Sequence, residues 1–249
     1  MITIYIYSLL SVLIVSLISF VSVFSLSLSE QFLKKYIFIF ISLAVGALLG
    51  DAFLHLIPES FESFSNPGLA GVLIIAGITG FFAVEKYLHW HHHGEDAEEP
   101  HIHPVGKLVL FSDGIHNIAD GMIIGASFIA SIPLGIATTM AVILHEIPQE
   151  LGDFTVLLHS GYTKYKAIWF NFLSALSAFF GVLISFALGQ AGEGFVSWIL
   201  SLAAGGFIYI AVADLIPELH KTKELKHSFL QAAGIIIGIL AMLALLFIR

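Results

Sequence analysis

Long apolar segments follow one another along the whole chain, separated by short polar connections. Runs of about 20 apolar residues are typical of helices that cross a bilayer. The alternation of polar and apolar residues that marks membrane β-strands is absent from the sequence. We therefore predict a single-domain, all-α polytopic membrane protein over residues 1–249. The eight expected spans are about 2–28, 36–57, 69–89, 105–130, 133–159, 166–190, 195–219 and 228–248.

Composition supports this class. The 249 residues are 58% hydrophobic and only 11% charged, whereas soluble domains have about a quarter charged residues. The first apolar segment is too long for a signal peptide and lacks a basic start, so we expect a membrane helix there. No cysteine is present, which excludes disulfides and thiolate ligands. Because the few basic residues are confined to connections, no nucleic-acid partner is expected, and the lipid bilayer is the expected environment.

The positions of the lysines predict the orientation of the spans. Lysines flank or lie in the connections after spans 1, 3, 5 and 7, and none occurs in the connections after spans 2, 4 and 6. The positive-inside rule then places both termini outside the cell and the connection 89–104 in the cytoplasm, in an inner or plasma membrane. This connection is rich in histidine and acidic residues, and short tracts of that kind bind metals. Its candidate metal-capturing residues are His91, His92, His93, His101 and His103.

An internal repeat relates the second and seventh spans. SLAVGALLGDAFLHLIPE (Ser42–Glu59) and SLAAGGFIYIAVADLIPE (Ser201–Glu218) share nine of 18 aligned positions. Because the two spans cross in opposite directions, the repeat is of the inverted kind found in secondary transporters. Spans 1–3 and 6–8 are then the two halves of a 3+2+3 arrangement around spans 4 and 5.

Polar side chains gather on these two central spans. DGIHNIADG on span 4 places its polar groups on about a third of the helix circumference, and HEIPQELGDF on span 5 faces it, because the connection at Ser131–Pro133 is tight. Intramembrane groups of this kind are costly and are functional by default. His116, Asp120, His145 and Glu146 form a nitrogen and oxygen ligand set suited to Zn²⁺. Asn117, Glu146 and Gln149 are expected to form a second site one turn away.

Further polar residues are predicted either to line the path of a cation or to surround the metal ligands. On span 2, Glu59 is expected nearest the outside, and on span 7, Glu218 nearest the cytoplasm. The complete predicted set of path residues and residues surrounding the ligands is Asp51, His55, Glu59, Asp113, Glu150, Asp153, Asp214 and Glu218. Interfacial positions explain Glu59 and Glu218 equally well, and proton relays also use such groups.

HNIADG together with HEIPQELGDF resembles the ZIP (Zrt/Irt-like) family of divalent-metal transporters, over essentially the whole chain. The nearest subfamily has HEXPHEXGD in span 5, from which this chain departs at Gln149. The resemblance implies a binuclear metal centre, with His116, Asp120, His145 and Glu146 at the first position and Asn117, Glu146 and Gln149 at the second. It also implies a homodimer and an elevator-like movement of spans 1, 4, 5 and 6. By its histidine at position 145, the chain resembles members of the family that transport zinc.

The predicted function is uptake of Zn²⁺ into the cytoplasm, with Cd²⁺, Fe²⁺ and Mn²⁺ as further candidate ions and no enzymatic activity. One alternative is an intramembrane zinc metalloprotease, because HEIPQ almost matches HExxH. That motif needs a second histidine four residues after the first, and Gln149 occupies this position. A metal-gated channel or a metal sensor is the other alternative, since the sequence separates carriers from channels poorly.

Overall fold

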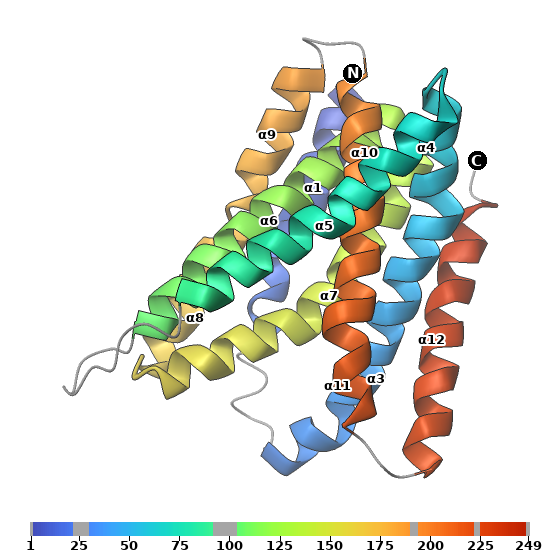
Figure 1. Cartoon of the computed structure of the whole chain (residues 1–249). Helices are drawn as coiled ribbons and strands as arrows, with labels where there is room; N and C mark the ends of the chain where they lie inside the picture. The colour runs from blue at the N-terminus through green and yellow to red at the C-terminus, as the bar shows by residue number, and fades with distance from the viewer. Residues whose placement is uncertain (1, 22–29, 92–103, 190–193, 222–224, 248–249) are drawn as a thin grey trace.

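The computed structural model describes residues 2–21, 30–91, 104–189, 194–221 and 225–247 (Figure 1). Within these ranges all regular structure is helical, as predicted, and η denotes a π-helix. The elements are α1 (Ile2–Ile18), α3 (Glu30–Asp51), η1 (Ala52–Leu56), α4 (Ile57–Ser63), α5 (Pro67–His91), α6 (Pro104–Ala130), α7 (Ile132–His159), α8 (Lys164–Ala175), α9 (Ala178–Gly189), α10 (Phe195–Tyr209), η2 (Ile210–Leu215), α11 (Ile216–His220) and α12 (Leu225–Leu245).

Five helical stretches of the described chain are long and apolar enough to cross a membrane. They are Ile37–Ser63, Pro67–Val84, Lys164–Gly189, Phe195–His220 and Lys226–Leu245. The apolar helix α1 has 17 residues, and α6 and α7 have 27 and 28 residues but contain the polar motifs. The all-helical membrane fold is therefore confirmed. The division into eight spans in a 3+2+3 arrangement stays a prediction.

The ends of the helices differ from the expected spans in several places, and the second span continues through α4 to Ser63. α1 ends at Ile18, where serines begin to recur, and the hydroxyl of Ser19 donates to the carbonyl of Ser16; such bonds compete with helical ones. α3 begins at Glu30, before its two lysines. The sixth expected span is divided into α8 and α9 between Ala175 and Ala178.

Both copies of the repeat contain a π-helix just before their shared proline. In η1 the N–H of Ile57 donates to the carbonyl of Ala52, and in η2 the N–H of Ile216 donates to that of Ala211. A proline has no backbone N–H to donate, and single π-helical turns inside α-helices are frequently found at functional sites. α3 and α10 run in opposite directions, so α4 and α11 lie at opposite ends of the bundle (Figure 1).

Equivalent glycines of the repeat make equivalent helix contacts. Gly46 on α3 lies against Gly238 on α12, and a Cβ at Gly46 would overlap the carbonyl of Ile235. Its repeat counterpart, Gly205 on α10, lies against Gly77 on α5 in the same way. Small residues permit close helix approach in lipid, where van der Waals packing drives helix association. The two contacts are therefore equivalent in the two copies of the repeat.

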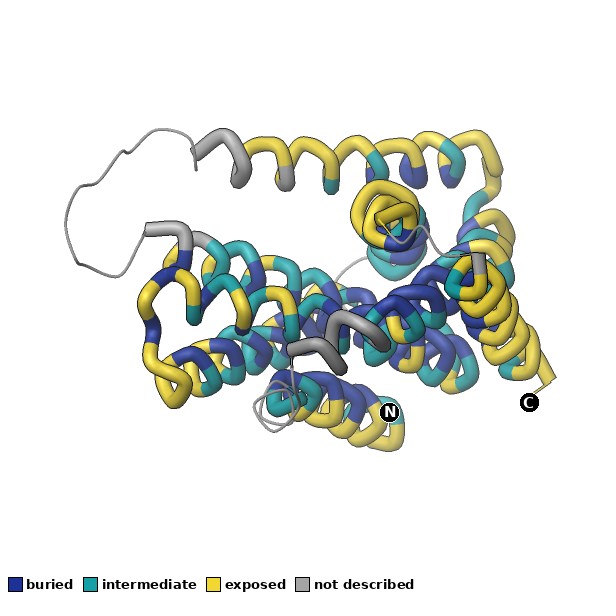
Figure 2. The backbone as a smooth tube through the Cα atoms, turned by 90° about the horizontal axis from the view of Figure 1, so that it is seen from below, coloured by how far each residue is buried: buried dark blue, intermediate teal, exposed yellow. Residues whose placement is uncertain are grey.

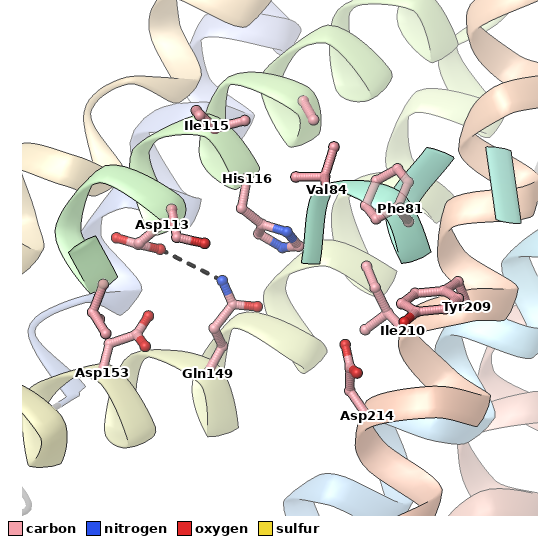
Figure 3. A pocket seen from close by; sticks show the side chains of 13 residues that line it. Phe81, Val84, Asp113, Ile115, His116, Gln149, Asp153, Tyr209, Ile210 and Asp214 are labelled. Carbon is pink, nitrogen blue, oxygen red and sulfur yellow. Dashed lines mark hydrogen bonds between the residues drawn. The ribbon is translucent and has the colours of Figure 1, made fainter. Parts of the chain in front are cut away.

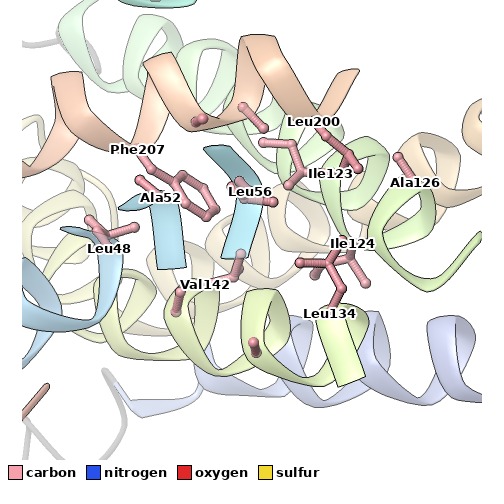
Figure 4. Packing of buried hydrophobic residues seen from close by; sticks show 14 of the residues in the cluster. Leu48, Ala52, Leu56, Ile123, Ile124, Ala126, Leu134, Val142, Leu200 and Phe207 are labelled. Carbon is pink, nitrogen blue, oxygen red and sulfur yellow. The ribbon is translucent and has the colours of Figure 1, made fainter. Parts of the chain in front are cut away.

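Burial separates a central core from an outer apolar surface (Figure 2). α5 and α12 expose large apolar side chains, including Ile75, Phe82 and Ile237, which suits contact with lipid tails. Inside, Leu56, Val142 and Phe207 belong to an apolar cluster contributed by η1, α7 and α10 (Figure 4). This cluster packs directly beside the polar site. The rings of Phe207 in the cluster and His145 on α7 meet edge to face, with centroids 6.0 Å apart.

Candidate metal centre

A tight connection brings the two polar motifs together. α6 ends at Ala130, and the Ser131 hydroxyl accepts a bond from the N–H of Leu134 to begin α7. On α6 the polar positions Asp113, His116, Asn117 and Asp120 have the i, i+3, i+4, i+7 spacing of one helical face. The two helices then run antiparallel, with their polar faces toward each other.

His116, Asp120, His145 and Glu146 converge as the sequence predicts, and one ligand atom of each lies within 4.8 Å of the others. The Nε2 atoms of His116 and His145 are 3.3 Å apart. Asp120 Oδ2 lies 3.6 Å from His116 Nε2 and 3.2 Å from His145 Nε2. Glu146 Oε1 lies 3.6 and 3.7 Å from the same two nitrogens. The side chain of His116 is 17% exposed and the other three are almost fully buried.

These distances suit four ligands of one small cation. Zinc ligands lie about 2.0–2.2 Å from the ion in a tetrahedron, whose edges are then about 3.3 to 3.6 Å. The measured distances lie within a few tenths of an ångström of that range. Both carboxylate oxygens of Glu146 are buried without a hydrogen-bond donor among the described residues. Burying an unpaired carboxylate is unfavourable in free energy, and a cation bound among these atoms would offset this penalty.

The ring of His145 is oriented by its own helix. Its Nδ1 lies 3.1 Å from the carbonyl of Ala141, one turn earlier on α7. When Nδ1 is protonated it donates to this carbonyl, and Nε2 then directs its lone pair toward Asp120 and Glu146. Ligand histidines in metal sites commonly have such a partner on the second ring nitrogen.

The second predicted position has a different arrangement from the expected one. Asn117 donates its amide to Asp113 Oδ1 at 2.8 Å and to the Asp113 carbonyl at 3.0 Å. Gln149 donates to the same Oδ1 at 3.5 Å (Figure 3). The two amides thus converge on Asp113, and both use N–H groups. Within the described part of the chain, the amide oxygen of Asn117 and Oδ2 of Asp113 are buried and have no hydrogen-bond partner. Whether Asn117, Glu146 and Gln149 hold a second ion stays a prediction.

Glu150 has a partner that sequence reasoning missed. Asn171 on α8 donates to the Glu150 carboxylate and, at 3.3 Å, to its backbone carbonyl. Both residues are fully buried. An asparagine in the middle of an apolar span was the available signal, since such amides seldom lack a partner in lipid. Asn171 therefore connects α8 to the polar face of α7.

Serines of α8, of α9 and of the turn between them bond to the backbone of α6. The hydroxyls of Ser174, Ser177 and Ser185 donate to the carbonyls of Leu110, Gly114 and Met122 at 2.9, 2.7 and 2.6 Å. These carbonyls are spaced along the same helix that presents His116 and Asp120. The bonds hold α6 against α8 and α9 while its polar side chains face α7.

Two cavities reach the four-residue cluster from the α11 end of the bundle. Cavity A, about 370 Å³, is lined by Asp113, His116, Gln149 and Asp153 and by apolar residues of α5 such as Phe81 (Figure 3). Cavity B, about 780 Å³, touches His145 and extends to Glu218 on α11. Asp214 on η2 lines both cavities. Glu218 is exposed and pairs with Lys221 at 2.5 Å.

The remaining predicted path residues lie apart from the cluster. Asp51 and His55 are buried on α3 and η1, with Asp51 Oδ1 3.3 Å from His55 Nδ1. His55 and Glu59 line a third cavity of about 230 Å³ at the α4 end, which we call cavity C. His91 ends α5, and His92, His93, His101 and His103 lie outside the described residues.

A sequence model of the family described as "ZIP Zinc transporter" matches residues 2–108 and 102–246. The chain belongs to this family. Over 163 residues it is 42% identical to zinc transporter ZIP10 of Mus musculus, a match that covers 62% of the chain and 20% of the relative. Zinc transporter ZIP13 of Mus musculus is 32% identical over 248 residues, or 82% of the chain and 68% of the relative.

Human zinc transporter ZIP4 is 31% identical over 252 residues, covering 74% of the chain and 39% of the relative. The chain therefore spans about a fifth of the length of the ZIP10 relatives it matches. Its ZIP family relatives are named as transporters and not as enzymes, which agrees with the prediction of no enzymatic activity. Placement in the subfamily with HEXPHEXGD stays a prediction.

Proposed function

We propose that this ZIP family member moves Zn²⁺ across a cell membrane into the cytoplasm through the cluster of His116, Asp120, His145 and Glu146. The convergence of two imidazoles and two carboxylates at zinc-like spacing supports this proposal most strongly. The matched family and relatives are named for zinc. The same nitrogen and oxygen ligands suit Cd²⁺, Fe²⁺ and Mn²⁺, whose affinities follow the metal series.

The cavities support a direction for the path. Cavities A and B open the cluster toward the α11 end, and the apolar cluster around Phe207 packs beside His145. By the lysine positions the α11 end faces the cytoplasm. The described conformation is then open to the cytoplasm. Release on that side passes Asp153, Asp214 and Glu218.

The protease alternative is disfavoured by the position of Gln149. Its amide nitrogen faces Asp113 at 3.5 Å and not the four-residue cluster. Glu146, which would be the general base of a protease, is itself a ligand candidate. Homodimer formation stays a prediction drawn from the family.

Uptake of ⁶⁵Zn²⁺ into proteoliposomes tests the proposal. We expect Glu146→Gln and His145→Gln to reduce uptake to background at equal protein incorporation, because each removes one of four ligands. His159→Gln is the matched control, since this imidazole is exposed and its Nδ1 lies 2.8 Å from the carbonyl of Thr155 on its own helix. Normal uptake by Glu146→Gln would refute the proposal, and competition by Cd²⁺, Fe²⁺ and Mn²⁺ would rank the further ions.

A further inference from the structure

The repeat places a potential metal ligand on each π-helix, at opposite ends of the bundle. His55 on η1 lines cavity C, and its aligned counterpart Asp214 on η2 lines cavities A and B. Glu59 and Glu218 are aligned in the same way and line cavities C and B. Asp214 and Glu218 belong to the proposed release path. His55 and Glu59 lie away from the four-residue cluster, at the other end of the bundle.

His55 has the orientation of a metal ligand. Its side chain is 7% exposed, and its Nδ1 lies 3.3 Å from the carboxylate of Asp51, which is fully buried. Its Nε2 is buried and has no hydrogen-bond partner among the described residues. In metal sites a carboxylate commonly stands behind the imidazole in this way, which fixes the ring and leaves the other nitrogen for the ion.

Cavity C supplies carboxylates on the same helical face. His55, Glu59 and Glu62 have the i, i+4, i+7 spacing and all three line the cavity. Their exposure increases in that order from buried through half-buried to exposed. The cavity, about 230 Å³, holds more than one water molecule. A hydrated cation entering past Glu62 would therefore meet Glu59 and then the unpartnered nitrogen of His55.

We propose that His55 Nε2, with the carboxylates of Glu59 and Glu62, forms a capture site for a divalent transition-metal cation at the outer mouth. Asp51 positions the imidazole and does not touch the ion. One imidazole and two carboxylates form a weaker ligand set than that of the α6–α7 cluster. The ion is thus held loosely before it moves inward. The inference deepens the proposed transport function, on which its place in the path rests.

Binding of Cd²⁺ to the full chain in nanodiscs, followed by titration calorimetry, tests the site separately from transport. The background variant carries His145→Gln and Glu146→Gln, and glutamine also replaces the five candidate metal-capturing histidines of the connection 89–104. It therefore lacks both the α6–α7 cluster and the loop ligands and is expected to retain one weak ion. Adding His55→Gln should lower the remaining affinity roughly tenfold or more, whereas adding His159→Gln should not. Glu59→Gln with Glu62→Gln repeats the test at less buried positions. Undiminished residual binding in both sets, or no residual binding at all, would overturn the proposal.

Transport gives a second readout in the otherwise unchanged protein. We expect His55→Gln to raise the KM for Zn²⁺ uptake roughly tenfold while kcat stays within about twofold. Loss of a ligand in the α6–α7 cluster should abolish uptake instead. An unchanged KM would contradict the capture role. If no variant or parent protein transports zinc, the transport proposal fails while the calorimetric result on cavity C still stands.

Discussion

The Nε2 atoms of His116 and His145 face each other at 3.3 Å, although the residues are 29 positions apart in the chain. The two rings are nearly perpendicular, with centroids 5.5 Å apart, so the nitrogens meet at their tips. Asp120 Oδ2 lies within 3.6 Å of both. Two imidazole nitrogens this close either share a proton or bind one cation together, and the adjacent carboxylates favour the cation.

Cobalt spectroscopy tests how the four residues bind. Co²⁺ in a tetrahedral site absorbs visible light far more strongly than in an octahedral one, so the purified protein is expected to give intense bands that Zn²⁺ removes. His116→Gln should lower the band intensity and weaken Co²⁺ affinity roughly tenfold or more, because it removes one nitrogen ligand. His159→Gln should give the spectrum of the parent protein. Weak bands in the parent protein would exclude a tetrahedral site.

The Glu150–Asn171 contact is expected to stabilise the fold. Asn171→Leu leaves the Glu150 carboxylate without its donor, so we expect a loss of about 1 kcal/mol in the free energy of unfolding. The double variant Glu150→Leu/Asn171→Leu should lose less than the sum of the single variants, because it leaves no unpaired buried group. Thermal unfolding in detergent measures all three. Additive losses would show that the two side chains do not interact.

The glycine contact between α3 and α12 is expected to be sensitive to size. Gly46→Val introduces a side chain where a Cβ already overlaps the carbonyl of Ile235, so the helices must separate and the unfolding temperature should fall. Gly80→Ala on α5 is the control, since nothing lies within 4 Å of its Cβ. That control should gain up to about 1 kcal/mol from helix propensity. Equal unfolding temperatures for the two variants would contradict the close packing.

The absence of cysteine in the chain permits a clean test of orientation. A single cysteine at Asn66, in the turn between α4 and α5, should react with a membrane-impermeant maleimide added to intact cells. A single cysteine at Thr163, in the turn between α7 and α8, should react only after the membrane is opened. The positive-inside rule predicts this difference, because Lys164 and Lys166 follow the second turn. The reverse labelling would invert the proposed direction of transport.

The spacing of polar residues within single helices explains which parts of the site could be predicted from the sequence. The spacing of Asp113, His116, Asn117 and Asp120 follows from helical geometry, so their common face was predictable. The short connection at Ser131 then required α7 to face α6. Asn171 was missed because it lies on α8, and no periodicity within one helix indicates which residue of another helix it meets. The convergence of the Asn117 and Gln149 amides on Asp113 also depends on side-chain rotamers.

The sequence by itself determined the class of the protein, because only helices and closed barrels span hydrocarbon and the chain lacks the alternating pattern of barrel strands. It determined the four metal-ligand candidates, because imidazoles and carboxylates are too costly in hydrocarbon without a function. It also determined the repeat that ends in a proline at positions 58 and 217. Only the tertiary structure decided that both repeats widen into π-helices. It alone placed His55 in one cavity and Asp214 in others. Such placement depends on how neighbouring helices pack, and packing is a property of surfaces that meet only in the folded chain.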